Sequence, residues 1–173
     1  GKTIILDMNG ETLSIGFSDS SKNLIVNNGT LTITGDGTFD ATEATSYKGF
    51  INNYGTLTVE NGTFQIADKA MTVHLRNQDG GKAVINGGTF SGGATIVRSF
   101  EGSNTTITGG SFTNSVYPAV DVNGETLITG GIFTNTSCSR CDSQNWGYTV
   151  RSGVDNDPDA KLTITPSSEG SVV

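Results

Sequence analysis

Charged residues, cysteine, histidine and long apolar runs are all scarce in this sequence of 173 residues. Only 16% of the residues are charged and the net charge is −7, with a pI near 4.5. Surfaces that bind nucleic acid concentrate lysine and arginine, so this balance argues against a nucleic-acid partner. No segment reaches the run of about 18 apolar residues that a membrane-spanning helix needs, and we therefore expect no membrane insertion.

The sequence contains two cysteines and a single histidine, which limits the metal or redox sites that it can form. Cys138 and Cys141 have the CxxC spacing of a redox pair or of half a zinc site. A structural zinc takes four nitrogen or sulfur ligands, and His74 lies far away in the sequence. No helical periodicity surrounds the pair, which disfavours a thioredoxin-like motif. We interpret it as a short disulfide, or as two free thiols, within a long loop, and we expect no cofactor.

The sequence does contain a repeat. A phrase of the form G-x-F recurs at spacings of 25, 26, 22 and 21 residues, with its aromatic residue at Phe39, Phe64, Phe90, Phe112 and Phe133. A short alternating stretch precedes each phrase, such as TLTIT at 30–34 or TLTVE at 56–60. Alternation of threonine with leucine, isoleucine or valine is typical of β-strands.

A further column of the repeat has an apolar residue, then a polar one, then asparagine, serine or glycine. Its members are Val26-Asn27-Asn28, Ile51-Asn52-Asn53, Leu75-Arg76-Asn77, Val97-Arg98-Ser99, Val122-Asn123-Gly124 and Val150-Arg151-Ser152. Asparagine and glycine tolerate the left-handed backbone of a sharp corner. Each repeat thus offers three short strands and three corners, and its asparagines can hydrogen-bond from one coil to the next.

A chain of this kind buries its apolar residues by coiling, so that each turn stacks on the previous one as parallel strands. Three strands per coil, an asparagine corner and an interior aromatic ladder resemble the right-handed parallel β-helix of pectate-lyase-like proteins. The phrase NNYGTLTVENGTF at 52–64 is similar to repeats in surface proteins of Gram-positive bacteria and in phage structural proteins. We predict an all-β fold, a right-handed parallel β-helix (β-solenoid) of about six to seven coils in a single domain spanning 1–173.

The two ends of the sequence suggest a module. The stretch GKTIILDMNG at 1–10 already has the pattern of a strand, and EGSVV at 169–173 follows closely on the last one. The ends of a solenoid expose unpaired backbone groups and apolar rungs. We therefore expect a fragment or module of a larger protein or assembly, with neighbouring domains or subunits capping the ends of the helix.

One corner of the coil varies in length. Between each repeat phenylalanine and the next corner column lie 6 to 16 residues, whereas the other two corners stay short. Insertions at one corner of a solenoid often form its binding face. Tyr47, Tyr117, Trp146 and Tyr148 lie in or at the end of these segments, and aromatic faces beside polar groups suit sugar rings. The alternative is that these rings anchor their loops and cover the core.

Arginines form a second candidate surface. Arg76, Arg98 and Arg151 occupy corresponding positions of three coils, with His74 and Asp121 on the same strands. If strand alternation holds, they form a solvent-facing stripe that binds the carboxylate of an acidic polysaccharide or of a sialic acid. The alternative is a solvated polar stripe. The resemblance to pectate lyases implies clustered acids around a calcium ion, but no second and third acid align with Asp121.

The C-terminal part contains Asp155, Asp157 and Asp159 at alternate positions, like the first half of an EF-hand loop. The match then fails, because Ala160 replaces the glycine and Pro166 occupies the place of the glutamate. We expect a polar turn here, with a weak calcium site as the alternative.

Taken together, these features favour a non-catalytic structural and adhesive module of a bacterial surface protein or a phage virion. Such a module is extracellular and presents a loop-rich face to a surface glycan or a protein partner. The alternatives are a polysaccharide lyase or hydrolase on the same fold, and a spacer or decoration protein without a ligand. The missing acid cluster disfavours the enzyme, and the aromatic loops favour adhesion over the spacer.

Overall fold

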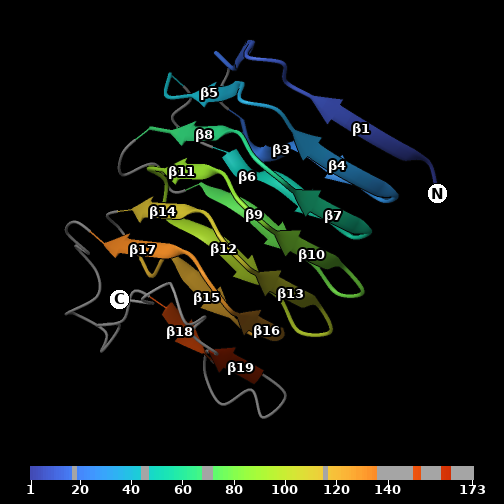
Figure 1. Ribbon diagram of the computed structural model, residues 1–173, viewed down its shortest axis with the longest axis vertical. Helices are drawn as coiled ribbons and strands as arrows, with labels where there is room; N and C mark the ends of the chain where they lie inside the picture. The colour runs from blue at the N-terminus through green and yellow to red at the C-terminus, as the bar shows by residue number, and fades with distance from the viewer. Residues whose placement is uncertain are drawn as a thin grey trace.

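The computed structural model describes residues 1–16, 19–43, 47–67, 72–114, 117–135, 150–152 and 161–164. Within these ranges the chain forms 19 strands and no helix. The strands stack in steps from the N-terminal end to the C-terminal end (Figure 1). The predicted all-β class is therefore confirmed.

The strands form three parallel sheets, and each coil contributes one strand to each sheet. Sheet A contains β1 (Thr3–Asp7), β4 (Thr30–Thr34), β7 (Thr56–Val59), β10 (Lys82–Ile85), β13 (Asn104–Ile107), β16 (Glu125–Ile128) and β19 (Lys161–Ile164). Sheet B contains β2 (Thr12–Ser14), β5 (Thr38–Ala41), β8 (Thr63–Ile66), β11 (Thr89–Ser91), β14 (Ser111–Asn114) and β17 (Ile132–Asn135). Sheet C contains β3 (Asp19–Asn27), β6 (Tyr47–Asn53), β9 (Val73–Asn77), β12 (Thr95–Ser99), β15 (Val120–Val122) and β18 (Val150–Ser152).

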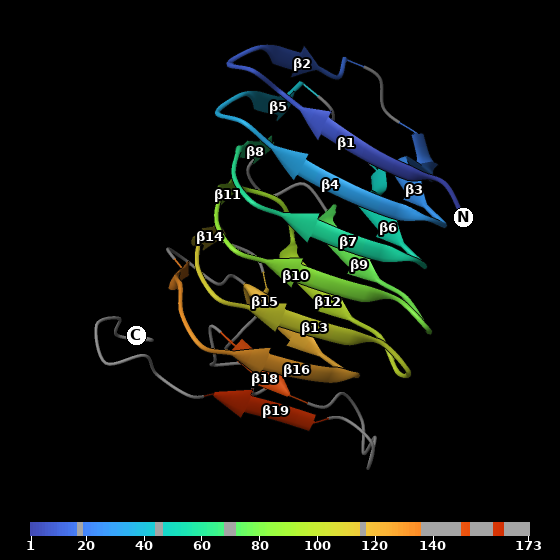
Figure 2. The ribbon, with the colours of Figure 1, turned by 45° about the vertical axis from the view of Figure 1, so that its right-hand side comes forward.

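The coil is right-handed. In Figure 2 the strands of sheet A lie in front and run from right to left, and the chain returns behind them. Each coil lies one step further from the N-terminal end than the coil before it. The predicted parallel β-solenoid is thus confirmed, with about five turns instead of six to seven. The step from β16 to β19 passes mainly through residues outside the described part of the chain.

A ladder of phenylalanine rings fills the inside of sheet B. The five repeat phenylalanines are in register on neighbouring strands and are at most 4% exposed. Neighbouring rings are nearly parallel, with centroids 4.6 to 5.1 Å apart, in the pairs Phe39–Phe64, Phe64–Phe90, Phe90–Phe112 and Phe112–Phe133. The interior ladder expected from the sequence is confirmed.

A ladder of buried asparagines forms the corner between sheets C and A. Asn27 Nδ2 donates to Asn53 Oδ1 at 2.7 Å, and Asn53 Nδ2 donates to Asn77 Oδ1 at 2.8 Å. The same column continues through Ser99 to Val122, where an apolar side chain interrupts the polar series, and then to Ser152. Because an unpaired buried amide is costly, these bonds fix the register of successive coils.

The predicted corner column was wrong in two coils. In the first coil, Ile25 and not Val26 occupies the inner apolar position, and Val26 is 52% exposed. In the fifth coil, Val120 aligns with Val97, so Val122 lies in the asparagine column. In both coils the triplet that is in register breaks the pattern, with an apolar residue at Val26 or Val122, whereas a shifted triplet fits it.

Replacing Asn53 by alanine should lower the free energy of unfolding by about 2 kcal/mol, because several polar groups lose a buried partner. Its side chain is 0% exposed and also donates to the carbonyl oxygens of Gly55 and Lys82. Chemical denaturation measures the loss. In Asn86→Ala, which removes an exposed amide bonded to Glu60, the change should stay within about 0.5 kcal/mol. Equal effects in the two variants would contradict a structural role for the ladder.

The first coil leaves apolar side chains uncovered. Ile4 and Leu13 belong to the inward columns, above Leu31 and Phe39. They are nevertheless 55% and 46% exposed, because no further coil lies over them. Capping of this end by a neighbouring domain or subunit stays a prediction.

Candidate binding groove

Among the corners between sheets C and A that the structure describes throughout, two are longer than the other three. Two residues separate β3 from β4, β6 from β7 and β15 from β16, whereas four residues separate β9 from β10 and β12 from β13. The longer corners are the turns Gln78–Gly81 and Phe100–Ser103, each closed by a backbone hydrogen bond between its last and first residues. Gly80 and Gly102 have φ of 74° and 73°, the positive value that the third residue of a type II turn requires.

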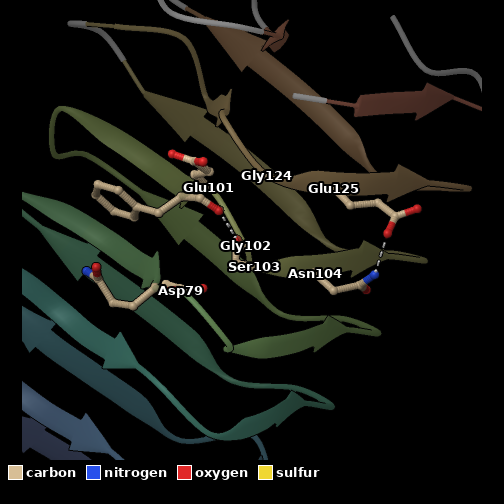
Figure 3. Close-up of a pocket in the computed structure, with 9 residues that line it drawn as sticks. Asp79, Glu101, Gly102, Ser103, Asn104, Gly124 and Glu125 are labelled. Carbon is tan, nitrogen blue, oxygen red and sulfur yellow. Dashed lines mark hydrogen bonds between the residues drawn. The ribbon is translucent and has the colours of Figure 1, made fainter. Parts of the chain in front are cut away.

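These two turns and the following coil enclose a groove of about 710 Å³. The lining residues are Gln78, Asp79, Phe100, Glu101, Gly102, Ser103, Asn104, Gly124 and Glu125. The labelled residues of Figure 3 come from three successive corners that lie next to one another. The two turns are linked by a hydrogen bond from the Gly80 amide to the Gly102 carbonyl. The groove thus belongs to the stacked corners and not to a single loop.

The lining combines one aromatic ring with hydrogen-bonding groups. Phe100 supplies the ring, and Gln78 and Asn104 supply amides. Asn104 Nδ2 donates to Glu125 Oε2 at 3.2 Å, and the Ser103 hydroxyl donates to the Phe100 carbonyl (Figure 3). Three carboxylates, on Asp79, Glu101 and Glu125, make the lining acidic. A mixture of an apolar face and polar side chains is typical of sites for small polar ligands.

Next to the groove, two arginines lie against the ring that lines it. Arg76 and Arg98 are register partners on β9 and β12. Their Cζ atoms lie 4.8 and 5.1 Å from the centroid of the Phe100 ring. Arg98 Nε is 3.3 Å from Asp121 Oδ2. In the same column, Asp121 separates Arg98 from Arg151, whose side chain lies outside the described part.

The predicted stripe is therefore partly present. Arg76 and Arg98 are adjacent as expected, and Asp121 follows them in the column. His74 was wrongly placed there, because it is 2% exposed and its ring packs against Phe50 and Phe90. In β9, Val73, His74 and Leu75 are all buried, so strand alternation fails at this point.

The aromatic loop residues are described only in part. Tyr117 is partly buried, and its amide donates to the Ala94 carbonyl at 3.1 Å. Tyr47 begins β6, but its side chain lies outside the described residues. Trp146 and Tyr148 also lie outside them. A binding role for these four residues stays a prediction.

Other predicted residues lie outside the described part as well. They are Cys138 and Cys141 of the CxxC pair, and Asp155, Asp157 and Asp159 of the calcium-loop pattern. Among the residues that the structure does describe, no group of three or more histidine, cysteine, aspartate or glutamate side chains is arranged to hold a metal ion.

The groove was not predicted from the sequence. Its signal lies in the two four-residue corners, QDGG at 78–81 and FEGS at 100–103, which vary less in length than the corner that follows each repeat phenylalanine. Comparison with protein-family models, curated proteins and solved structures found no match. In the described ranges, no helix has the length and apolar character required to cross a membrane.

Proposed function

We propose that this chain is a non-catalytic structural and adhesive β-helix module that binds a saccharide in the groove between sheets C and A. The observation that carries the proposal is the groove itself, about 710 Å³ in volume and lined by Phe100 among amides and carboxylates. A sugar offers apolar C–H faces to an aromatic ring and hydroxyl groups to polar side chains. Both kinds of partner are present in one place.

The backbone around the groove is held in place by buried hydrogen bonds, which favours binding. Asn77, which precedes the first long turn, is fully buried and donates to the Asn104 carbonyl and to the Thr105 hydroxyl. Ser99, which precedes the second, shares hydrogen bonds with Ser103 and Thr105. Because the walls are ordered before the ligand arrives, less conformational entropy is lost on binding.

The setting we propose is extracellular, on a bacterial cell surface or on a virion, where the ligand is a surface glycan or a glycosylated partner protein. A solenoid suits this role because its stacked coils make a stiff, extended support. The exposed Ile4 and Leu13 at the first coil favour a neighbouring domain or subunit as a cap. Fold alone does not decide function, so binding must be measured.

Replacing Phe100 by alanine should weaken saccharide binding at least about tenfold, because an aromatic anchor is lost from the centre of the site. A glycan array identifies the ligand, and titration calorimetry compares the affinities of the variants for it. Ile132→Ala is the control: Ile132 lies on β17 of sheet B, is 64% exposed and does not line the groove. Ile132→Ala should bind the ligand like the unmodified chain.

Other outcomes separate the alternatives. If Phe100→Ala binds normally and a Tyr117→Ala, Trp146→Ala double variant does not, adhesion stands but the variable loops form the binding face. Cleavage of the bound saccharide by the purified chain would favour a polysaccharide lyase or hydrolase. Failure to bind any glycan would favour a spacer or decoration protein.

A further inference from the structure

The two arginines beside the groove differ in their counter-charges. Arg98 has Asp121 at 3.3 Å, and its side chain is 37% exposed. Arg76 has no ion pair or hydrogen bond among the described residues, and the Nε atoms of both arginines are buried without a hydrogen-bond partner. Burial, and then the adjacent charge of Arg98, lowers the pKa of Arg76. The protein thus holds a partly buried cation whose charge is not neutralised.

The position of Arg76 is maintained by its packing. A Cβ atom on Gly49 would come within 2.5 Å of the Arg76 Cδ atom, so the absence of a side chain at residue 49 makes room for the arginine. On the other side, its guanidinium group lies against the Phe100 ring. Because the side chain is already held in place, little rotamer entropy remains to be lost when an anion binds.

We propose that Arg76 and Arg98 bind one oxyanion, a carboxylate or a sulfate, carried by an otherwise neutral saccharide whose rings lie in the groove. This inference rests on the proposed function and names the charge of its ligand. Paired guanidinium groups offer parallel N–H donors that match the oxygens of such a group. Phe100 belongs both to the groove lining and to the arginine pair, so a single ligand reaches both.

The rest of the groove limits the ligand to one negative charge. Asp79, Glu101 and Glu125 line it, and the whole chain has a net charge of −7. A polymer with a carboxylate on every sugar would bring like charges close together, which lowers affinity. The site therefore favours a single charged group over a polyuronate.

Four soluble probes test the inference against the folded chain: lactose, 3′-sialyllactose, lactose 3′-sulfate and tetragalacturonic acid. The two singly charged lactose derivatives should bind at least about tenfold more tightly than lactose, as expected for charge-assisted hydrogen bonds. The tetragalacturonic acid should bind less tightly than either. NMR detection of the arginine Nε–H groups should show the Arg76 signal shifting with both derivatives and with inorganic sulfate.

Three variants test which residues bind the charged group of the saccharide. Arg76→Gln should reduce binding of both derivatives to the level of lactose. Asp121→Asn should tighten binding about two- to fivefold, because it releases Arg98 from a partly exposed ion pair. Lys2→Gln removes the same charge from an exposed position just before β1, in the first coil, and should leave binding unchanged. A thermal melt of each variant confirms that it is folded.

The possible results separate the oxyanion site from the saccharide site. Saccharide binding that is unaffected by Arg76→Gln, or equal affinity for lactose and its charged derivatives, would overturn the oxyanion site and leave the proposed function standing. If sulfate shifts the Arg76 signal but no sugar adds affinity, the saccharide part fails, and the proposed function fails with it. If sulfate and both derivatives leave the Arg76 signal unchanged, the arginine pair is not an anion site.

Discussion

Replacing Phe90 by alanine should lower the free energy of unfolding by about 3–5 kcal/mol, as for other large buried aromatic residues. Phe90 is 2% exposed and is the middle ring of the ladder. It lies 4.6 Å from Phe64 and 5.1 Å from Phe112, and the His74 ring meets it edge-on at 5.9 Å. The substitution leaves a cavity between two coils whose backbones are fixed by parallel pairing on both sides.

Urea denaturation followed by circular dichroism measures this loss. Ile132→Ala is the control, since Ile132 is on β17 of the same sheet but is 64% exposed. Its effect should stay within about 0.5 kcal/mol. A loss below about 1 kcal/mol for Phe90→Ala would mean that the ladder adapts by closing the cavity, contrary to the rigid stacking described above.

The sequence allowed much of this fold to be predicted because a solenoid places the same type of residue at the same position in every coil. Phe39 and its four counterparts, and the asparagines at 53 and 77, could be aligned without any structure. The errors arose where local patterns were ambiguous. Leu24, Ile25 and Val26 are three consecutive apolar residues, so the side chain that points inward is decided only by pairing with the next strand.

The candidate site was harder to predict for a related reason. Its residues come from three coils, and none of them is unusual within its own repeat. The groove exists because two successive corners have four residues in place of two, a difference that becomes a shape only when the coils are stacked. The arginine pair was predictable from coil spacing, but its packing against Phe100 was not, because that contact depends on how the corner turns back over sheet C.

The burial of His74 leads to a second large effect, a dependence of stability on pH. The His74 Nε2 atom lies 3.1 Å from the Ser91 carbonyl oxygen and 3.2 Å from that of Gly92. Since a carbonyl only accepts, Nε2 carries the proton. Nδ1 is buried without a partner, and the ring packs against Phe50 and Phe90. The folded protein therefore holds a neutral imidazole.

Burial lowers the pKa of His74 from its ordinary 6.5 to about 4, and the hydrogen bonds with Gly92 and Ser91 oppose this shift only in part. Below pH 6.5 the unfolded chain takes up a proton at this residue, whereas the folded chain does so only near pH 4. The stabilisation from the neutral ring is thus complete above pH 6.5 and is lost as the pH falls to 4. The loss should reach about 3 kcal/mol, since each unit of pKa difference corresponds to about 1.4 kcal/mol.

Denaturation midpoints should be measured from pH 7.5 to 4, a range that spans the two pKa values, on the unmodified chain and on His74→Phe. The difference between the two proteins isolates the effect of the histidine. Phenylalanine is apolar and already occupies the neighbouring position at Phe50, so the variant should lose far less stability across the range. Asp40, whose pKa is lowered from 3.8 by hydrogen bonds from Thr42, is present in both proteins, so its contribution cancels in the comparison. If both proteins lose stability in parallel, water reaches the His74 ring in the folded state, and the imidazole is not the group that senses pH.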